Sequence, residues 1–179
     1  MLIQPYTPSW PQKFKQLKEI LLRNIPVPAT LEHIGSTSVP ELPAKDIIAM
    51  DLVYDKEQDF TPIKTHLEGL GYYHKGDQGI PQREAFKRHA PEKRQFPLLY
   101  TIPHHLYVSP QGSPELYRHL TFRNYLRKNK EARLAYSKLK QEIAYKANQD
   151  KKLYAQIKEK AARSFVEAIL EKARKEDHL

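Results

Sequence analysis

The chain has 179 residues, of which 40% are hydrophobic and none is cysteine, and it carries a formal net charge of +9. This composition excludes disulfide bonds, thiolate zinc sites and cysteine nucleophiles, and it is too apolar for a disordered chain. Because no apolar run approaches the roughly 20 residues of a membrane span, and no secretory signal opens the chain, we expect a cytoplasmic protein with no membrane partner.

The first predicted elements alternate between helix and strand. Apolar spacing predicts a helix over 8–22 with Ser9 as its N-cap, and a short strand follows over 29–33. The clearest strand covers 47–54, where side chains alternate between two faces. One face carries Ile48, Met50, Leu52 and Tyr54, and the other carries Ile47, Ala49, Asp51 and Val53.

Further along, we expect a helix over 62–70 that is closed by Gly71, and two strands over 98–102 and 105–108. All 14 prolines and all 6 glycines lie at or before Pro114, so the remainder is predicted to form long helices. Ser113 is the expected N-cap, with Pro114 at the first helical position. The likeliest break between helices is at 148–150.

These elements predict an α/β (α+β) fold in one domain over 1–179. A small mixed sheet flanked by helices would occupy about 1–112, and long helices about 113–179. The helical part holds the excess charge, since 118–179 contain 17 basic and 8 acidic residues. Such a surface could attract nucleic acid, although a solvated lysine-rich face is the more ordinary interpretation. The oligomeric state stays open.

A glycine and hydroxyl-rich loop precedes the clearest strand. Gly35 lets a ligand approach the backbone closely, and Ser36, Thr37 and Ser38 add hydroxyl donors. Lys45 follows, where an ammonium group could neutralise a phosphate oxygen. The loop is therefore a candidate phosphate site, and an ordinary structural turn is the alternative.

Several segments, in order and at matching spacing, resemble the GrpB family (UPF0157). The similarity is strongest over Leu31–Pro40 and continues through Leu42, Ala44, Lys45 and Ile47-Ile48. It also includes Pro5-Tyr6, Trp10-Pro11, Phe14, His104-His105-Leu106, Gly112-Ser113-Pro114-Glu115, Arg118-His119-Leu120, Phe122-Arg123 and Tyr125-Leu126. The resemblance implies a nucleotidyltransferase-like fold, in which a Gly-Ser loop holds nucleotide phosphates beside acidic strand residues that bind divalent metal.

Asp51 is then the expected metal ligand, for Mg²⁺, and a catalytic residue. Ala49 stands where the family usually has Asp, and Asp46 points to the opposite face, so Asp51 is the one acid on its side of this strand. No Asp or Glu occurs between Glu92 and Glu115 to supply a further acid. The alternative for Asp51 is a polar residue on the solvated face of an edge strand.

The resemblance also singles out histidines and one arginine. His105 is a candidate catalytic residue, and His33 could contact a phosphate or base, although a lone histidine more often satisfies a core hydrogen bond. Arg83 could supply charge to a triphosphate from the segment 82–88. The alternative is that residues 82–88 form a mobile surface segment with no role in binding.

Three functional hypotheses follow. The first is a nucleotidyltransferase-like protein that binds a nucleoside triphosphate with Mg²⁺. The second is a non-catalytic module of the same fold that binds a phosphorylated small molecule or a partner. Its motive is Ala49, which stands where the family usually has Asp. The third is RNA binding through the basic C-terminal helices.

Overall fold

The computed structural model describes residues 2–89 and 95–177. In this part of the chain the elements are α1 (Ser9–Arg23), β1 (Ala29–Ile34), β2 (Ile48–Tyr54), α2 (Phe60–Gly69), β3 (Tyr72–His74), β4 (Glu84–Arg88), α3 (Leu98–Thr101), β5 (His104–Pro110), α4 (Pro114–Lys128), α5 (Lys130–Lys146) and α6 (Lys151–Asp177). Two short 3₁₀ turns, η1 (Ser36–Ser38) and η2 (Glu57–Asp59), precede β2 and α2.

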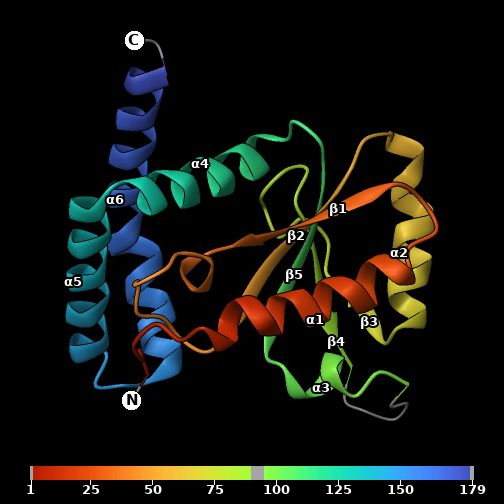
Figure 1. The fold of residues 1–179 in the computed structure, drawn as a ribbon, viewed down its shortest axis with the longest axis horizontal. Helices are drawn as coiled ribbons and strands as arrows, with labels where there is room; N and C mark the ends of the chain where they lie inside the picture. The colour runs from red at the N-terminus through yellow and green to blue at the C-terminus, as the bar shows by residue number, and fades with distance from the viewer. Residues whose placement is uncertain (1, 90–94, 178–179) are drawn as a thin grey trace.

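The strands form one mixed sheet in the order β1-β2-β5-β4-β3 (Figure 1). β2 and β5 run parallel, and the other neighbouring strands are antiparallel. β2 is therefore an interior strand, flanked by β1 and β5. The predicted α/β class, a small mixed sheet flanked by helices, is confirmed.

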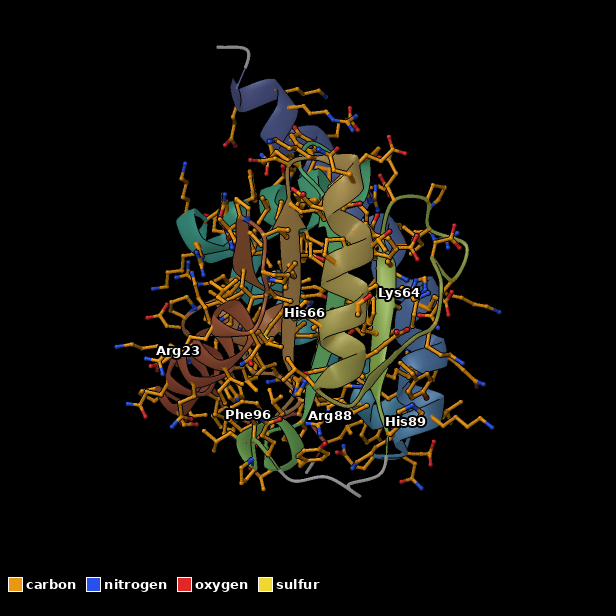
Figure 2. All side chains as sticks on the ribbon, turned by 90° about the vertical axis from the view of Figure 1, so that its right-hand side faces the viewer. Arg23, Lys64, His66, Arg88, His89 and Phe96 are labelled. Carbon is orange, nitrogen blue, oxygen red and sulfur yellow. The ribbon has the colours of Figure 1, made fainter. Side chains whose placement is uncertain are left out.

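One face of the sheet packs against α1, α2 and α3. Ile48, Met50, Leu52 and Tyr54 of β2 all belong to this core, as the predicted alternation requires. The helices contribute Trp10, Leu17, Leu21, Ile63, Leu67 and Leu99. Figure 2 shows α2 running lengthwise along the sheet.

Trp10 links this helical layer to the loop before β2. Its side chain is fully buried, and its Nε1 donates to Asp46 Oδ1 at 2.9 Å. The Lys13 ammonium also contacts Asp46, at 2.7 Å from Oδ1. Asp46 thus lies on the α1 side, away from Asp51, as the strand alternation predicted.

The three C-terminal helices pack around the loop that follows β1. In Figure 1, α5 and α6 lie side by side and α4 extends from them across one end of the sheet. Val39 and Leu42 of the loop are buried against Leu126, Tyr136 and Ile169. Because the loop supplies part of this core, the helices and the loop stabilise each other.

The helix boundaries agree in part with the expectations. The break at 148–150 is confirmed, since Asn148 and Gln149 have φ of +47° and +60°, outside a right-handed helix. Ser113 is confirmed as the N-cap of α4. A second break at Asn129 was not predicted; its side chain caps α5 by accepting from the Ala132 N–H at 2.8 Å. No helix in the described residues has the length and apolarity of a membrane span.

Two local predictions are wrong. Residues 98–102 were expected to form a strand, but Leu98–Thr101 is a short helix. Pro97 has φ −54°, and its carbonyl accepts from the N–H groups of Tyr100 and Thr101, so the proline starts a helical turn. A short apolar run in the sequence is compatible with either a helix or a strand, which is why the strand was expected. Ser9 is the first helical residue of α1, with Pro8 before it, and makes no side-chain cap.

The strands β3 and β4 were not anticipated. β4 lies between β3 and β5, and Ala85 and Phe86 within it are buried. A mobile surface segment is therefore wrong for Glu84–Arg88. In the sequence, charged residues at both ends of β4 hide the apolar pattern that would have indicated a strand.

Candidate functional site

The glycine loop ends β1 with a sharp change of direction. Gly35 has φ +70°, a conformation that side chains with a Cβ rarely adopt. A Cβ at this position would lie 3.3 Å from the Cβ of Ala49 on the neighbouring strand. The loop then turns through η1, where the Ser38 N–H bonds the Gly35 carbonyl at 3.2 Å. Glycine is thus needed for both the turn and the close approach to β2.

The loop forms one wall of a cavity of about 150 Å³, which we call the Gly35 pocket. Five of the predicted site residues line it: Gly35, Ser36, Thr37, Lys45 and His105. The remaining lining residues are Ile3, Ala44, Ile47, Ala49, Lys140, Tyr154 and Lys158. Strand pairing brings the first set together, because Ala49 of β2 lies beside His105 of β5 and Ile34 of β1.

Three lysines give the Gly35 pocket a basic lining. Lys45 comes from the loop before β2, Lys140 from α5 and Lys158 from α6. No Asp or Glu is found among its described lining residues. Uncompensated ammonium groups at a hydroxyl-lined cavity favour an anionic ligand.

Burial, with a contribution from neighbouring ammonium groups at Lys140 and Lys45, lowers the pKa of these lysines. Burial, followed by the charge of Lys158, lowers the pKa of Lys140 to about 6. Burial and the ammonium groups of Lys158 and Lys151 lower the pKa of Lys45, and burial lowers that of Lys158. An anion bound here would raise these pKa values again, since opposite charge favours the charged form.

Lys140 and Lys45 are also held in place by neutral partners. Lys140 Nζ donates to the Pro43 carbonyl. Lys45 Nζ lies 5.0 Å from the centre of the Tyr154 ring, a distance suited to a cation–π contact. The pocket lysines are thereby oriented without a carboxylate.

Asp51 lies two residues beyond Ala49 but in a separate, closed environment. It is fully buried, and its Oδ2 lies 2.6 Å from His119 Nδ1 of α4. His119 Nε2 lies 3.3 Å from Glu115 Oε1. The alternative of a solvated residue on an edge strand is therefore wrong, because β2 is an interior strand and His119 covers the carboxylate.

The environment of His119 makes it a cation at neutral pH. Burial alone would lower its pKa, but hydrogen bonds and charge from Asp51 and Glu115 raise it to about 9. The hydrogen bond from His119 in turn lowers the pKa of Glu115. An imidazolium thus lies between two carboxylates, at the position where the family resemblance predicted a metal.

This arrangement does not fit a pair of divalent metal ions. Among residues 2–89 and 95–177, no group of three or more His, Asp or Glu side chains is arranged to hold a metal. Asp51 has one oxygen held by the imidazolium and no solvent exposure. Asp51 Oδ1 is buried without a hydrogen-bond partner in the described residues, so one unpaired carboxylate oxygen is present where a two-metal site uses several oxygen ligands.

The other predicted residues lie outside the Gly35 pocket. Ser38 is buried; its Oγ donates to the Gly35 carbonyl at 2.6 Å, and its own carbonyl accepts from Arg127. His33 is buried too, with Nε2 2.9 Å from Thr37 Oγ1, and burial together with Arg127 and Arg123 lowers its pKa to about 4. Ser38 and His33 therefore form hydrogen bonds to loop residues and do not line the Gly35 pocket.

Arg83 is separated from the glycine loop. Its guanidinium carbon lies 4.6 Å from the centre of the Tyr107 ring, close to the buried Asp51 and His119 group. His104 and His105 face opposite sides, as predicted, and only His105 lines the Gly35 pocket. Desolvation and the ammonium groups of Lys45, Lys87 and Lys158 lower the pKa of His105.

Several site residues were missed because they come from the C-terminal helices. Lys140, Tyr154 and Lys158 reach the pocket, and His119 covers Asp51. Lys140 has no acidic residue four positions before or after it, which was a weak indication that this lysine has a role other than a surface ion pair. Which helix face would meet the loop could not be read from local spacing.

Many arginines of the basic helices are used internally. Arg118 pairs with Glu167 at 2.7 Å, Arg123 with Glu32 at 2.7 Å, and Arg133 with Glu41 at 2.7 Å. Two of these pairs join the helices to the first part of the chain. The excess charge is consequently less available to nucleic acid than the sequence indicated.

Comparison with known proteins identifies relatives over nearly the whole chain. Residues 1–172 match the family model described as GrpB protein. UPF0157 protein BH1888 of Halalkalibacterium halodurans is 33% identical over 172 residues, which are 94% of this chain and 80% of that protein. UPF0157 proteins YqkA of Bacillus subtilis and PA4798 of Pseudomonas aeruginosa are 32% and 31% identical over 78% and 88% of this chain. The chain spans 38% and 62% of the length of these two relatives.

Solved structures show the same fold. The crystal structure of GrpB from Enterococcus faecalis matches with a TM-score of 0.78 and 28% identity over 99% of both chains. Cid1 poly(U) polymerase, in a structure bound to MgATP, matches with a TM-score of 0.51 and 13% identity over 78% of this chain and 45% of that one. The second likeness extends to a nucleotidyltransferase and concerns the fold alone.

Proposed function

This chain belongs to the GrpB family, and we propose that its Gly35 pocket binds the phosphate group of a small molecule without needing a divalent metal. The observation that carries the proposal is the set of three lysines, Lys45, Lys140 and Lys158, that converge on one cavity with no carboxylate among its described lining residues. In metal-dependent phosphate sites a cation supplied by the solvent neutralises the ligand. Here the chain supplies the positive charge itself.

Each side chain has a separate part in this function. Lys45 and Lys158 would contact phosphate oxygens as ammonium donors, and Ser36 and Thr37 would donate from their hydroxyl groups. Lys140 is more deeply buried and would gain a proton as the anion enters. Binding would then take up a proton near neutral pH, which calorimetry in buffers of different ionisation enthalpy measures directly.

The test is a calorimetric titration with ATP and with inorganic pyrophosphate in the presence of EDTA. We expect saturable binding without metal, and Lys158→Gln should weaken it about tenfold through the loss of one charge-assisted contact. Lys172→Gln on the exposed side of α6 is the matched control and should bind as the wild type does. No heat at millimolar ligand, or binding that appears only with Mg²⁺, would contradict the proposal.

A second candidate is nucleoside triphosphate binding with Mg²⁺, as in a nucleotidyltransferase. It is supported by the fold likeness and by Ala49, which lines the Gly35 pocket on the same face of β2 as Asp51. Ala49→Asp is the discriminating variant. If the wild type already needs Mg²⁺ to bind the nucleotide, this second candidate is favoured. If only the Ala49→Asp variant shows an effect of Mg²⁺, metal-free binding by the wild type is favoured.

A further inference from the structure

A second cavity, of about 400 Å³, lies where α3 leads into β5. Its walls come from β3, β4, α3 and the start of β5. The described lining residues are Tyr72, Phe86, Lys87, Arg88, His89, Leu99, Tyr100, Ile102, Pro103, His104 and His105. We call it the Arg88 cavity; the two cavities share His105 at their rims.

Arg88 is the unusual group in this cavity. All three of its side-chain nitrogens are buried, and none has a hydrogen-bond partner within the described part of the chain. The guanidinium carbon lies 3.3 Å from the centre of the Tyr100 ring and 5.4 Å from that of Tyr72. Ring contacts occupy the flat faces of a guanidinium and leave its N–H edge free to donate. Figure 2 places Arg88 at the lower end of the sheet, between Phe96 and His89.

Two neighbouring polar groups, His104 and Tyr72, are neutral and already paired. His104 Nδ1 lies 2.7 Å from the Ile102 carbonyl, so this nitrogen donates, and Nε2 accepts from the Tyr72 hydroxyl at 2.6 Å. Burial lowers the pKa of His104 to about 4 and raises the pKa of Tyr72, so both remain uncharged at neutral pH. The bond between them fixes the Tyr72 ring near Arg88.

The described lining of the Arg88 cavity contains no Asp or Glu to compensate the guanidinium. A buried charge without a partner is strongly unfavourable, and the planar fork of arginine matches an oxyanion with two parallel N–H donors. A cavity of this size with aromatic walls and two basic side chains, Arg88 and Lys87, is typical of small-molecule sites for anions.

We propose that the Arg88 cavity binds the oxyanion group, carboxylate or phosphate, of a small organic molecule. This site is separate from the Gly35 pocket and does not depend on its function. Arg88 forms the bidentate contact, and Tyr100 and Tyr72 orient the guanidinium.

The test follows the Arg88 Nε–Hε resonance by ¹H–¹⁵N NMR during titration with sodium benzoate and, separately, with sodium phosphate at constant ionic strength. The resonance is assigned from its loss in Arg88→Lys. We expect a saturable shift with at least one of the two anions; benzoate alone identifies a carboxylate ligand, and phosphate alone a phosphate ligand. No saturable shift with either anion overturns the proposal.

The variants separate a binding role from a structural one. In Arg88→Lys the backbone amides of Leu99 and Ile102 report binding, and we expect affinity to fall at least about tenfold because lysine lacks the fork. Arg23→Lys, on the exposed end of α1, and Lys158→Gln, in the Gly35 pocket, should keep the wild-type affinity. Equal affinity in Arg88→Lys and the wild type, with both folded, overturns the proposal, as does equal loss in Lys158→Gln.

Discussion

The pair of Asp51 and His119 joins β2 to α4 through two charges that are largely withdrawn from water. Asp51 is fully buried, so removal of the imidazolium leaves the carboxylate without its hydrogen-bonded cation. The hydrogen bond between them holds the sheet against the C-terminal helices.

His119→Ala should therefore destabilise the protein by about 3–5 kcal/mol, the usual cost of breaking one half of a buried ion pair. Urea unfolding followed by circular dichroism measures the change in free energy. His66→Ala, at an exposed position of α2, is the control and should leave the free energy of unfolding nearly unchanged. A loss for His119→Ala no larger than that of the control would show that the pair contributes little.

Lys140 makes the stability of the protein depend on pH. Its pKa is about 6 in the folded chain, against an ordinary value of 10.5, so the folded state disfavours the proton that the unfolded state binds. Between these two values wild-type stability gains up to about 1.4 kcal/mol per pH unit from this group as pH rises. Below pH 6 both states are charged and the dependence ends.

Lys140→Met removes this group while keeping an unbranched apolar stem. Its stability relative to the wild type should be highest near pH 6 and should fall steadily as pH rises to 9. Unfolding free energies at four pH values between 6 and 9 check the trend, since the other titrating groups are common to both proteins. A constant difference across this range would contradict the lowered pKa.

At the scale of elements, the junction between α4 and α5 depends on one side chain. Asn129 leaves the helical conformation and caps α5 through its Oδ1, which accepts from the Ala132 N–H. We expect Asn129→Ala to cost about 1 kcal/mol, the typical value for loss of an N-cap. Thermal unfolding gives the measurement, and Asn124→Ala, at an exposed position within α4, should cost less than this cap.

The elements also show which parts of the fold were accessible from sequence. β2 was predicted because its residues are apolar apart from Asp51, and the two-residue period of a strand assigned its faces. The helix at Leu98–Thr101 was missed because four residues are too few to show a period, and Pro97 starts the helical turn. β4 was missed because Arg83, Lys87 and Arg88 conceal its two buried residues.

For the whole molecule, the Gly35 pocket is assembled from both parts of the chain. Gly35, Ser36 and Lys45 come together through strand pairing and neighbouring loops, and a careful sequence analysis could predict this. Lys140 and Lys158 arrive only when α5 and α6 pack against the loop. Long-range helix packing depends on shape complementarity over many side chains, which local spacing does not encode.

This assembly predicts that a ligand stabilises distant segments together. With saturating inorganic pyrophosphate, hydrogen exchange should slow both in residues 35–38 and in α6 around Lys158, while α2 exchanges as before. Mass spectrometry of peptic peptides provides the measurement. Protection restricted to residues 35–49 would show that the C-terminal helices take no part in binding.

Trp10 is the one tryptophan of the chain, and its indole donates to Asp46, the residue next to Lys45 of the Gly35 pocket. Trp10 itself does not line the pocket, but a shift of the Lys45 backbone would reach the indole's hydrogen-bond acceptor through one peptide unit. The emission spectrum of this single fluorophore is therefore expected to change on ligand binding if the loop before β2 moves, and no label is needed to record it.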